Sequence, residues 1–541
     1  MENIALIFTI VIAVLLSGMV MRLLPWGIPL PLIQIVSGMI ISAVFQKGIE
    51  LNPEVFFLLF LPPLLFLDGW RIPKDALQRD RLGIFQLAFG LVIITVLVLG
   101  YIIHWLIPAM PLAVSFALAA IVSPTDPVAV AGITRKLAVP SRLMHILEGE
   151  ALFNDASGLV AFRMAVLAAV TGVFSLSQAT TSFLWVAGAG LVTGFIITRL
   201  LAIGRTWFNQ RFGEELGAEI LISLLTPFAA YAAAEHIGGS GILAAVAAGL
   251  TMSSHELSGR VSSLTRMRRT AIWDTVQFAL NGIMFVLLGE QLPNIFMGAV
   301  HVVQQTGHHN PWWLIVYALV ICCTLIVLRF LWVAASIYVP RHLYKNTASS
   351  TATWTHVWIL ALGGVRGAVT LAGVLTLPLL LPNGTDFPAR DLAIFLAATV
   401  IIISLIIASI GLPWVLKNPP TPAKAFSTYA DQKHLALKAA YEAATQHSKQ
   451  LVLELSQKNP SDSANYQLLQ QRLLAEFKHN LSTDYQHSDT NSSQQIEYQL
   501  RLIMIQHARQ TIYQLARNKK ISDDVARTLV QQLDFDEVRF S

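Results

Sequence analysis

Hydrophobic residues are grouped in long blocks along the first three quarters of the chain, separated by short polar loops. Blocks of about 20 apolar residues have the length that a helix needs to cross the hydrocarbon core of a bilayer. The pattern therefore predicts an all-α polytopic membrane protein with thirteen transmembrane helices. Their approximate limits are 2–21, 27–45, 53–70, 82–106, 111–134, 141–170, 182–203, 216–236, 239–254, 271–291, 312–339, 353–381 and 391–416.

The loops between these blocks alternate in their content of basic residues. One set of loops holds seventeen Lys and Arg residues, whereas the opposite set holds only Lys47 and Arg390. Because basic loops stay in the cytoplasm, we expect the N-terminus outside and the C-terminus inside the cell. An odd number of spans agrees with this alternation.

The composition changes after residue 416. Residues 417–541 are polar, and two stretches, 435–457 and 494–517, have the apolar spacing of helices. The segment 484–495 between them is rich in Ser, Asn and Gln and is typical of a flexible connector. We therefore expect a transmembrane domain over 1–416 and a cytoplasmic helical tail over 417–541, with a role in assembly or regulation and an unidentified ligand.

The chain is 55% hydrophobic and only 13% charged, whereas soluble domains contain about 25% charged residues. The two cysteines, Cys322 and Cys323, are adjacent in one apolar block, which excludes a disulfide or a metal site between them. Nucleophile–base sets, zinc spacings and phosphate loops are also missing from the sequence. We therefore expect neither an enzyme nor a resident cofactor, and no nucleic-acid partner.

Polar residues inside one apolar block carry the first functional signal. The segment EGEALFNDASG, 148–158, brings Glu148, Glu150, Asn154 and Asp155 into a predicted span. A charge deep in a bilayer costs at least ~2.5–3.5 kcal/mol, and such residues face the bundle interior or a wet path. The alternatives are a structural ion pair and an ion or proton site.

Helical geometry separates these acids. Glu150 and Asn154 are four residues apart and share one face, whereas Asp155 lies about 140° around the helix from Glu150. We therefore assign Glu150 to a structural ion pair and Asp155 to the working site. Glu148 is a further acid that could line the cavity.

The segment SPTDPVAV, 123–130, places two prolines inside another predicted span. Proline cannot donate a backbone hydrogen bond, so the carbonyls of Ala120 and Ser123 lose their helical partners. A helix broken at membrane depth is tolerated where it is buried in protein or lines a wet cavity. A proline-kinked packing helix is the alternative. The break would offer Na⁺ or Li⁺ the oxygens of Ser123, Thr125 and Asp126.

A second break is predicted at GGVRGAVTLAGV, 363–374, where glycines surround Arg366. A buried guanidinium keeps its proton and requires a carboxylate, which we assign to Glu150. The two broken spans, 111–134 and 353–381, run in opposite directions, as in transporters built from two inverted repeats with crossed discontinuous helices. Arg329 and Asn281 have the pattern of structural residues.

Asp68 follows two prolines near the cytoplasmic end of its span. It either guides cations into the cavity from inside or lies at the membrane interface.

Three segments, SPTDPVAV, EGEALFNDASGLV and GGVRGAVTLAGVL, together resemble the bacterial NhaP-type branch of the monovalent cation:proton antiporter family, which also contains the animal sodium/proton exchangers. The likeness covers essentially all of the membrane part. It implies a thirteen-helix homodimer in the bacterial inner membrane, in which a mobile core slides like an elevator against a dimerisation domain. The residues it implicates are the cation and proton site at Asp155 with Asn154, the unwound helix at Thr125 and Asp126, and the ion pair of Glu150 and Arg366.

Two details of the resemblance bear on selectivity. The Asn that precedes Asp155 is similar to that of members described as electroneutral. Some relatives have Ser directly after the motif's Glu, whereas this chain has Ala151, so one hydroxyl ligand is missing and a water molecule would replace it.

We therefore expect one-for-one exchange of a monovalent cation for H⁺, in which Asp155 binds either ion but not both. Na⁺ bound at Asp155 and Thr125 is the first choice, and Li⁺ or K⁺ are alternatives. A cation channel would carry current without stoichiometric proton counterflow. A membrane sensor built around the tail would have no need for buried carboxylates.

Overall fold

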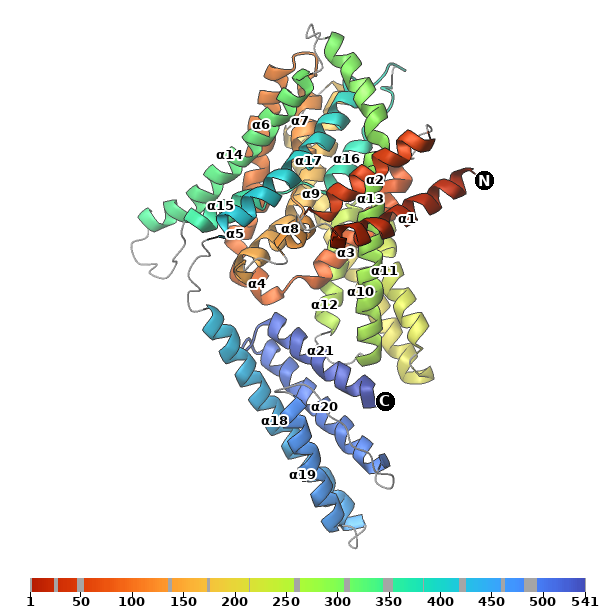
Figure 1. Ribbon diagram of the computed structural model, residues 1–541, viewed down its shortest axis with the longest axis vertical. Coiled ribbons are helices and arrows are strands. Elements are labelled where there is room, and N and C mark those ends of the chain that lie inside the picture. The colour runs from red at the N-terminus through yellow and green to blue at the C-terminus, as the bar shows by residue number, and fades with distance from the viewer. Residues whose placement is uncertain are drawn as a thin grey trace.

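The computed structural model describes the chain in segments that are helical almost throughout (Figure 1). Within them there is no strand, only an isolated bridge between Leu380 and Asp386. Among the described residues, eight helices are long and apolar enough to cross a membrane, and three helices of 10–17 residues are also apolar. The described segments are 2–23, 28–45, 53–134, 139–172, 176–213, 215–256, 263–305, 312–343, 354–382, 384–417, 425–458, 463–480 and 494–540.

Every predicted hydrophobic block contains at least one helix, which confirms an all-helical membrane fold. The count of thirteen crossings in two inverted repeats stays a prediction. Lys47 and most of the predicted connector 484–495 lie outside the described residues.

The helices of the membrane part form two bundles. The scaffold bundle consists of α1 (Glu2–Leu23), α2 (Leu30–Phe45), α3 (Pro53–Arg71), α10 (Leu176–Phe212), α11 (Leu216–His236), α12 (Gly241–Glu256) and α13 (Ser263–Gln305). The crossover bundle consists of α4 (Lys74–Arg79), α5 (Arg81–Phe85), the π-helix η1 (Gln86–Leu91), α6 (Val92–Leu106), α7 (Leu112–Ile121), α8 (Pro127–Thr134), α9 (Ser141–Thr171), α14 (Trp312–Leu343), α15 (Trp354–Leu362), α16 (Ala368–Leu375) and α17 (Arg390–Val415).

Glycines permit the closest helix contacts within the scaffold bundle. At Gly249 on α12, an added Cβ would lie 2.1 Å from the Phe66 carbonyl oxygen of α3. At Gly289 on α13, it would lie 1.9 Å from the Ile35 carbonyl oxygen of α2. Small residues let helix backbones approach in this way inside membranes. The two bundles meet mainly where α17 packs on α13 and where α3 packs on α16.

Two predicted spans are interrupted, as their sequences indicated. The block 111–134 is divided into α7 and α8, and the block 353–381 is divided into α15 and α16. Proline ends the first helix because it cannot continue the hydrogen-bond ladder, and Pro127 then begins α8, where its missing N–H costs nothing. Glycines occupy the second interruption. Both breaks lie within the crossover bundle.

The C-terminal segment forms α18 (Ala425–Lys458), α19 (Ser463–Asn480), α20 (Gln494–Arg517) and α21 (Asp523–Phe540). Ala436, Ala440 and Ala444 line one face of α18 at a spacing of four residues, and they belong to an apolar cluster with α20 that is separate from the core of the membrane part. Figure 1 shows α18 to α20 projecting away from the membrane helices, whereas α21 lies across one end of them. The tail therefore has its own core and one docking helix.

Candidate functional site

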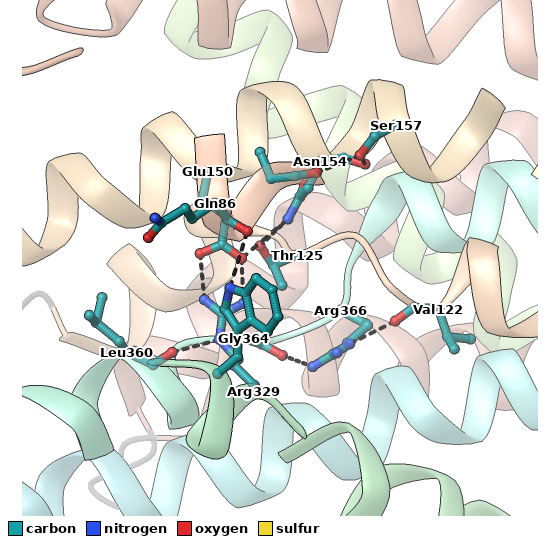
Figure 2. A network of polar contacts seen from close by, with 12 residues as sticks. Gln86, Val122, Thr125, Glu150, Asn154, Ser157, Arg329, Leu360, Gly364 and Arg366 are labelled. Carbon is teal, nitrogen blue, oxygen red and sulfur yellow. Dashed lines mark hydrogen bonds and ion pairs between the residues drawn. The ribbon is translucent and has the colours of Figure 1, made fainter. Parts of the chain in front are cut away.

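The two helix breaks meet at the centre of the crossover bundle. The backbone N–H of Asp126 donates to the Val365 carbonyl at 2.7 Å, which joins one break to the other. Arg366 Nε donates to the Val122 carbonyl at 2.8 Å, and its Nη1 donates to the Gly364 carbonyl (Figure 2). These carbonyls follow the ends of α7 and α15, where backbone groups lack helical partners and carry partial negative charge. Arg366 thus stabilises two helix C-termini at once.

The predicted ion pair between Glu150 and Arg366 is wrong. Glu150 instead pairs with Arg329 of α14 through both carboxylate oxygens, and the Nη2–Oε2 distance is 2.6 Å. Both side chains are buried, at 1% and 2% exposure. Arg329 Nε also donates to the Leu360 carbonyl at 2.7 Å. The prediction failed because helix-end carbonyls already satisfy Arg366, which removes its need for a carboxylate.

Asn154 connects this ion pair to the first break. Its Nδ2 donates to Thr125 Oγ1 at 2.9 Å and reaches Glu150 Oε1 at 3.5 Å. Figure 2 shows these residues as one chain of contacts that continues to Arg329. The other amide atom, Oδ1, is buried and has no hydrogen-bond partner among the described residues. Asn154 therefore holds Thr125 in position.

Asp126 has a structural role beside any role in binding. Its Oδ1 accepts hydrogen bonds from the backbone N–H groups of Val128 at 2.9 Å and Ala129 at 3.2 Å. This is the N-cap arrangement that begins a helix, here α8. Its Oδ2 faces Gly367, where an added Cβ would lie only 1.8 Å away. Glycine at 367 therefore makes room for the Asp126 carboxylate.

A cavity lies between the crossover bundle and the scaffold bundle, and three carboxylates line it. Asp155 comes from α9, Asp126 from the first break, and Asp68 from α3. Within the described part of the chain, the Asp155 carboxylate makes no hydrogen bond or ion pair, although the residue is only 5% exposed. The other lining residues are Leu64, Leu65, Pro124, Thr125, Pro127, Val128, Gln277, Asn281, Gly367, Val369 and Thr370.

The remaining expected site residues lie elsewhere. Ser123 is buried at the end of α7, outside the lining of this cavity. Glu148 lies on α9 beside His145 and beside Asp524 and Arg527 of the tail. The structure therefore brings Asp155, Thr125, Asp126 and Asp68 together and leaves out Ser123 and Glu148.

Sequence reasoning missed Gln277 of α13, and it assigned Asn281 of the same helix a structural role only. Gln277 and Asn281, four residues apart, face the cavity from the scaffold bundle. Amides at this spacing in an apolar helix are the signal that could have found them. Arg329 was expected to be a structural residue, and the structure supplies its partner, Glu150.

Comparison with known proteins identifies the family of this chain. Residues 8–418 match the family described as sodium/hydrogen exchanger, transmembrane. The chain is 36% identical over 537 residues to the uncharacterized Na⁺/H⁺ exchanger YjcE of Escherichia coli, covering 98% of this chain and 97% of that protein.

Two further relatives extend the comparison. The sodium, potassium, lithium and rubidium/H⁺ antiporter of Bacillus subtilis is 44% identical over 421 residues, covering 75% of this chain and 61% of that protein. This chain thus spans less than two thirds of the Bacillus relative. The sodium proton antiporter MjNhaP1 of Methanocaldococcus jannaschii has a similar fold, with a TM-score of 0.58 and 20% identity over 76% of this chain and all of that one. The chain therefore belongs to the sodium/hydrogen exchanger family, as a monovalent cation:proton antiporter of the NhaP type.

Proposed function

We propose that this antiporter exchanges Na⁺ for H⁺ across the bacterial inner membrane with Asp155 as the shared binding site. The observation that carries the proposal is the Asp155 carboxylate, which lines the cavity at the helix break and has no basic side chain paired with it among the residues that the structure describes. A carboxylate in this position can hold a metal cation or a proton, but not both. Competition at one group couples the two fluxes without any chemical reaction.

The oxygens around Asp155 support a hard monovalent cation as cargo. Thr125 lies on the same cavity, and Asp126 adds a carboxylate. The Bacillus relative is named for sodium, potassium, lithium and rubidium. Because Ala151 supplies no hydroxyl, we propose that Li⁺ and K⁺ are also accepted, with Na⁺ preferred.

The division into two bundles supports alternating access. The cavity is bounded by α9 and the helix breaks on one side and by α3 and α13 on the other. A sliding movement of the crossover bundle against the scaffold bundle would carry Asp155 from one side of the membrane to the other. We propose this elevator movement in a homodimer, with the C-terminus in the cytoplasm. Exchange of one cation for one proton is electroneutral.

Exchange in proteoliposomes tests the proposal. We expect a pH gradient to drive Na⁺ uptake by the wild type, and we expect Asp155→Asn to abolish it because the amide holds neither ion. Asp386→Asn is the matched control, since this carboxylate is exposed and lies far from α9 in the chain. Na⁺ exchange at wild-type rate in Asp155→Asn would refute the shared site.

The same vesicles distinguish the rival functions. Electroneutral exchange predicts equal rates with the membrane potential clamped and unclamped. A channel would instead carry Na⁺ current without proton counterflow.

A further inference from the structure

The last helix of the tail, α21, contacts both bundles of the membrane part. On the scaffold bundle, Arg527 Nη2 donates to the Trp70 carbonyl at 3.0 Å and to Ser253 Oγ at 2.8 Å. Farther along α21, Asp534 accepts from Arg266 Nε of α13 at 2.8 Å. These contacts fix α21 to the ends of α3, α12 and α13.

The beginning of α21 and the residues before it reach the crossover bundle. Asp523 Oδ2 accepts from the backbone N–H of Lys74 at 3.0 Å. Asp524 Oδ2 lies 2.8 Å from Nε2 of His145, which is on the same helix as Asp155. Lys519 Nζ donates to Gln78 Oε1 of α4 at 2.9 Å. One helix thus bridges two bundles that also meet directly where α17 packs on α13 and where α3 packs on α16.

The contact between α21 and the membrane part contains a buried charge, and this charge is paired. Asp534 is 3% exposed, and it is neutralised by Arg266 from the membrane part and by Arg509 from α20, whose Nη2 lies 3.0 Å away. Three apolar side chains of α21 are buried in the apolar cluster of the tail, namely Val525, Leu529 and Leu533. A movement of α21 therefore changes its packing against the tail core as well as its contacts with the membrane helices.

We propose that α21 is a latch that restrains movement between the two bundles while it is docked, and that an acidic cytoplasm strengthens the docking. The inference rests on the proposed exchange by relative movement of the bundles, and it names the regulator of that movement. Docked α21 slows exchange, and its release permits full turnover.

The charges at the contact give the direction of the pH effect. His145 is faced by Asp524 from α21, by Glu148 from its own helix and by Asp75 from α4. A protonated imidazole pairs with Asp524, and a neutral one loses that attraction as the pH rises. Arg527 lies near Glu148 and keeps its charge throughout.

Asp75 acts in the same direction. Burial, and then the neighbouring Asp523, raise the pKa of the Asp75 carboxyl in the docked arrangement. A carboxyl group whose pKa is raised by docking favours the docked state at low pH, and this contribution is lost as the pH rises through the docked pKa. Both groups therefore weaken the docking as the pH rises.

The test compares exchange rates of the full chain at about pH 6.5 and about pH 8.5, because an ordinary imidazole loses most of its remaining charge between these values. We expect Asp524→Asn and His145→Gln to raise the rate at the lower pH about fivefold, the effect of one partly exposed ion pair, and to leave the rate at the higher pH unchanged. Gln531→Ala is the matched control, because Gln531 is exposed on the same helix. Variants with the wild-type pH profile would overturn the latch.

A second measurement separates this inference from the proposed function. Amide hydrogen exchange reports docking of α21 without transport, and it can be measured in Asp155→Asn. We expect the protection of α21, corrected for the intrinsic pH dependence, to fall at the higher pH and in Asp524→Asn, with α18 unchanged. Equal protection of α21 in all of these samples would overturn the latch even if exchange is observed. Loss of protection without any cation exchange in the wild type would support docking and refute the antiport proposal.

Discussion

The pairing of Glu150 with Arg329 decides how charge is tolerated inside the crossover bundle. Two fully buried charges are expensive to desolvate, and only a bidentate contact with further hydrogen bonds offsets that cost. Both conditions are met, since Arg329 also donates to Leu360 and Glu150 also contacts Asn154. The pair therefore supports the position of Thr125 through Asn154, although neither charge lines the cavity.

Removing one partner should be more damaging than removing both. We expect Glu150→Gln to lower the free energy of unfolding by about 3–5 kcal/mol, because it leaves the Arg329 guanidinium buried without its carboxylate. The double variant Glu150→Gln with Arg329→Met should recover part of this loss. Thermal unfolding of purified protein measures both. If Arg366→Met rescued the stability of Glu150→Gln and Arg329→Met did not, Glu150 would pair with Arg366, as the sequence suggested.

Gly367 carries only a hydrogen atom where other residues carry Cβ, and an added Cβ would clash with the Asp126 carboxylate. We expect Gly367→Ala to displace the Asp126 carboxylate, uncapping α8 at a cost of about 1 kcal/mol and lowering the exchange rate by much more than this loss of stability explains. Gly132→Ala is the control, since an added Cβ at Gly132 on α8 meets nothing within 4 Å. The exchange rate and the melting temperature are measured for both alanine variants. Equal values in the two variants would contradict the prediction.

At the scale of elements, the interruptions of two helices were predictable, but their partners were not. Pro124 and Pro127 mark the first break directly, because proline removes the donor that a helix needs. Glycines around Arg366 mark the second. The sequence does not say which groups a freed carbonyl meets, and this is why the carbonyls of Val122 and Gly364 were overlooked as partners of Arg366.

The same limit applies to Asp126. Its position between two prolines indicated an oxygen ligand, whereas the capping of α8 depends on where the helix resumes. Asp155 was predicted from its position on α9 relative to Glu150, because an angle around one helix needs no tertiary information. Gln277 and Asn281 approach from another bundle, and only the packing of α13 brings them to the cavity.

At the scale of the molecule, the membrane part and the tail have separate apolar cores. All residues that line the cavity lie before residue 416. We therefore expect a chain ending at Lys417 to exchange cations in proteoliposomes, with a rate that depends less on pH than that of the full chain. A folded, truncated protein without exchange would show that the tail is needed for transport itself.

Because main-chain oxygens hold Arg366, the crossing of the helices is fastened by groups that neither gain nor lose protons. Acid or alkali can therefore change the occupancy of the cavity without removing the acceptors of these hydrogen bonds. Such a frame would let the antiporter work across a wide range of cellular pH. The pH would then change ion binding in the cavity and the docking of α21, while the hydrogen bonds at the helix crossing stay the same.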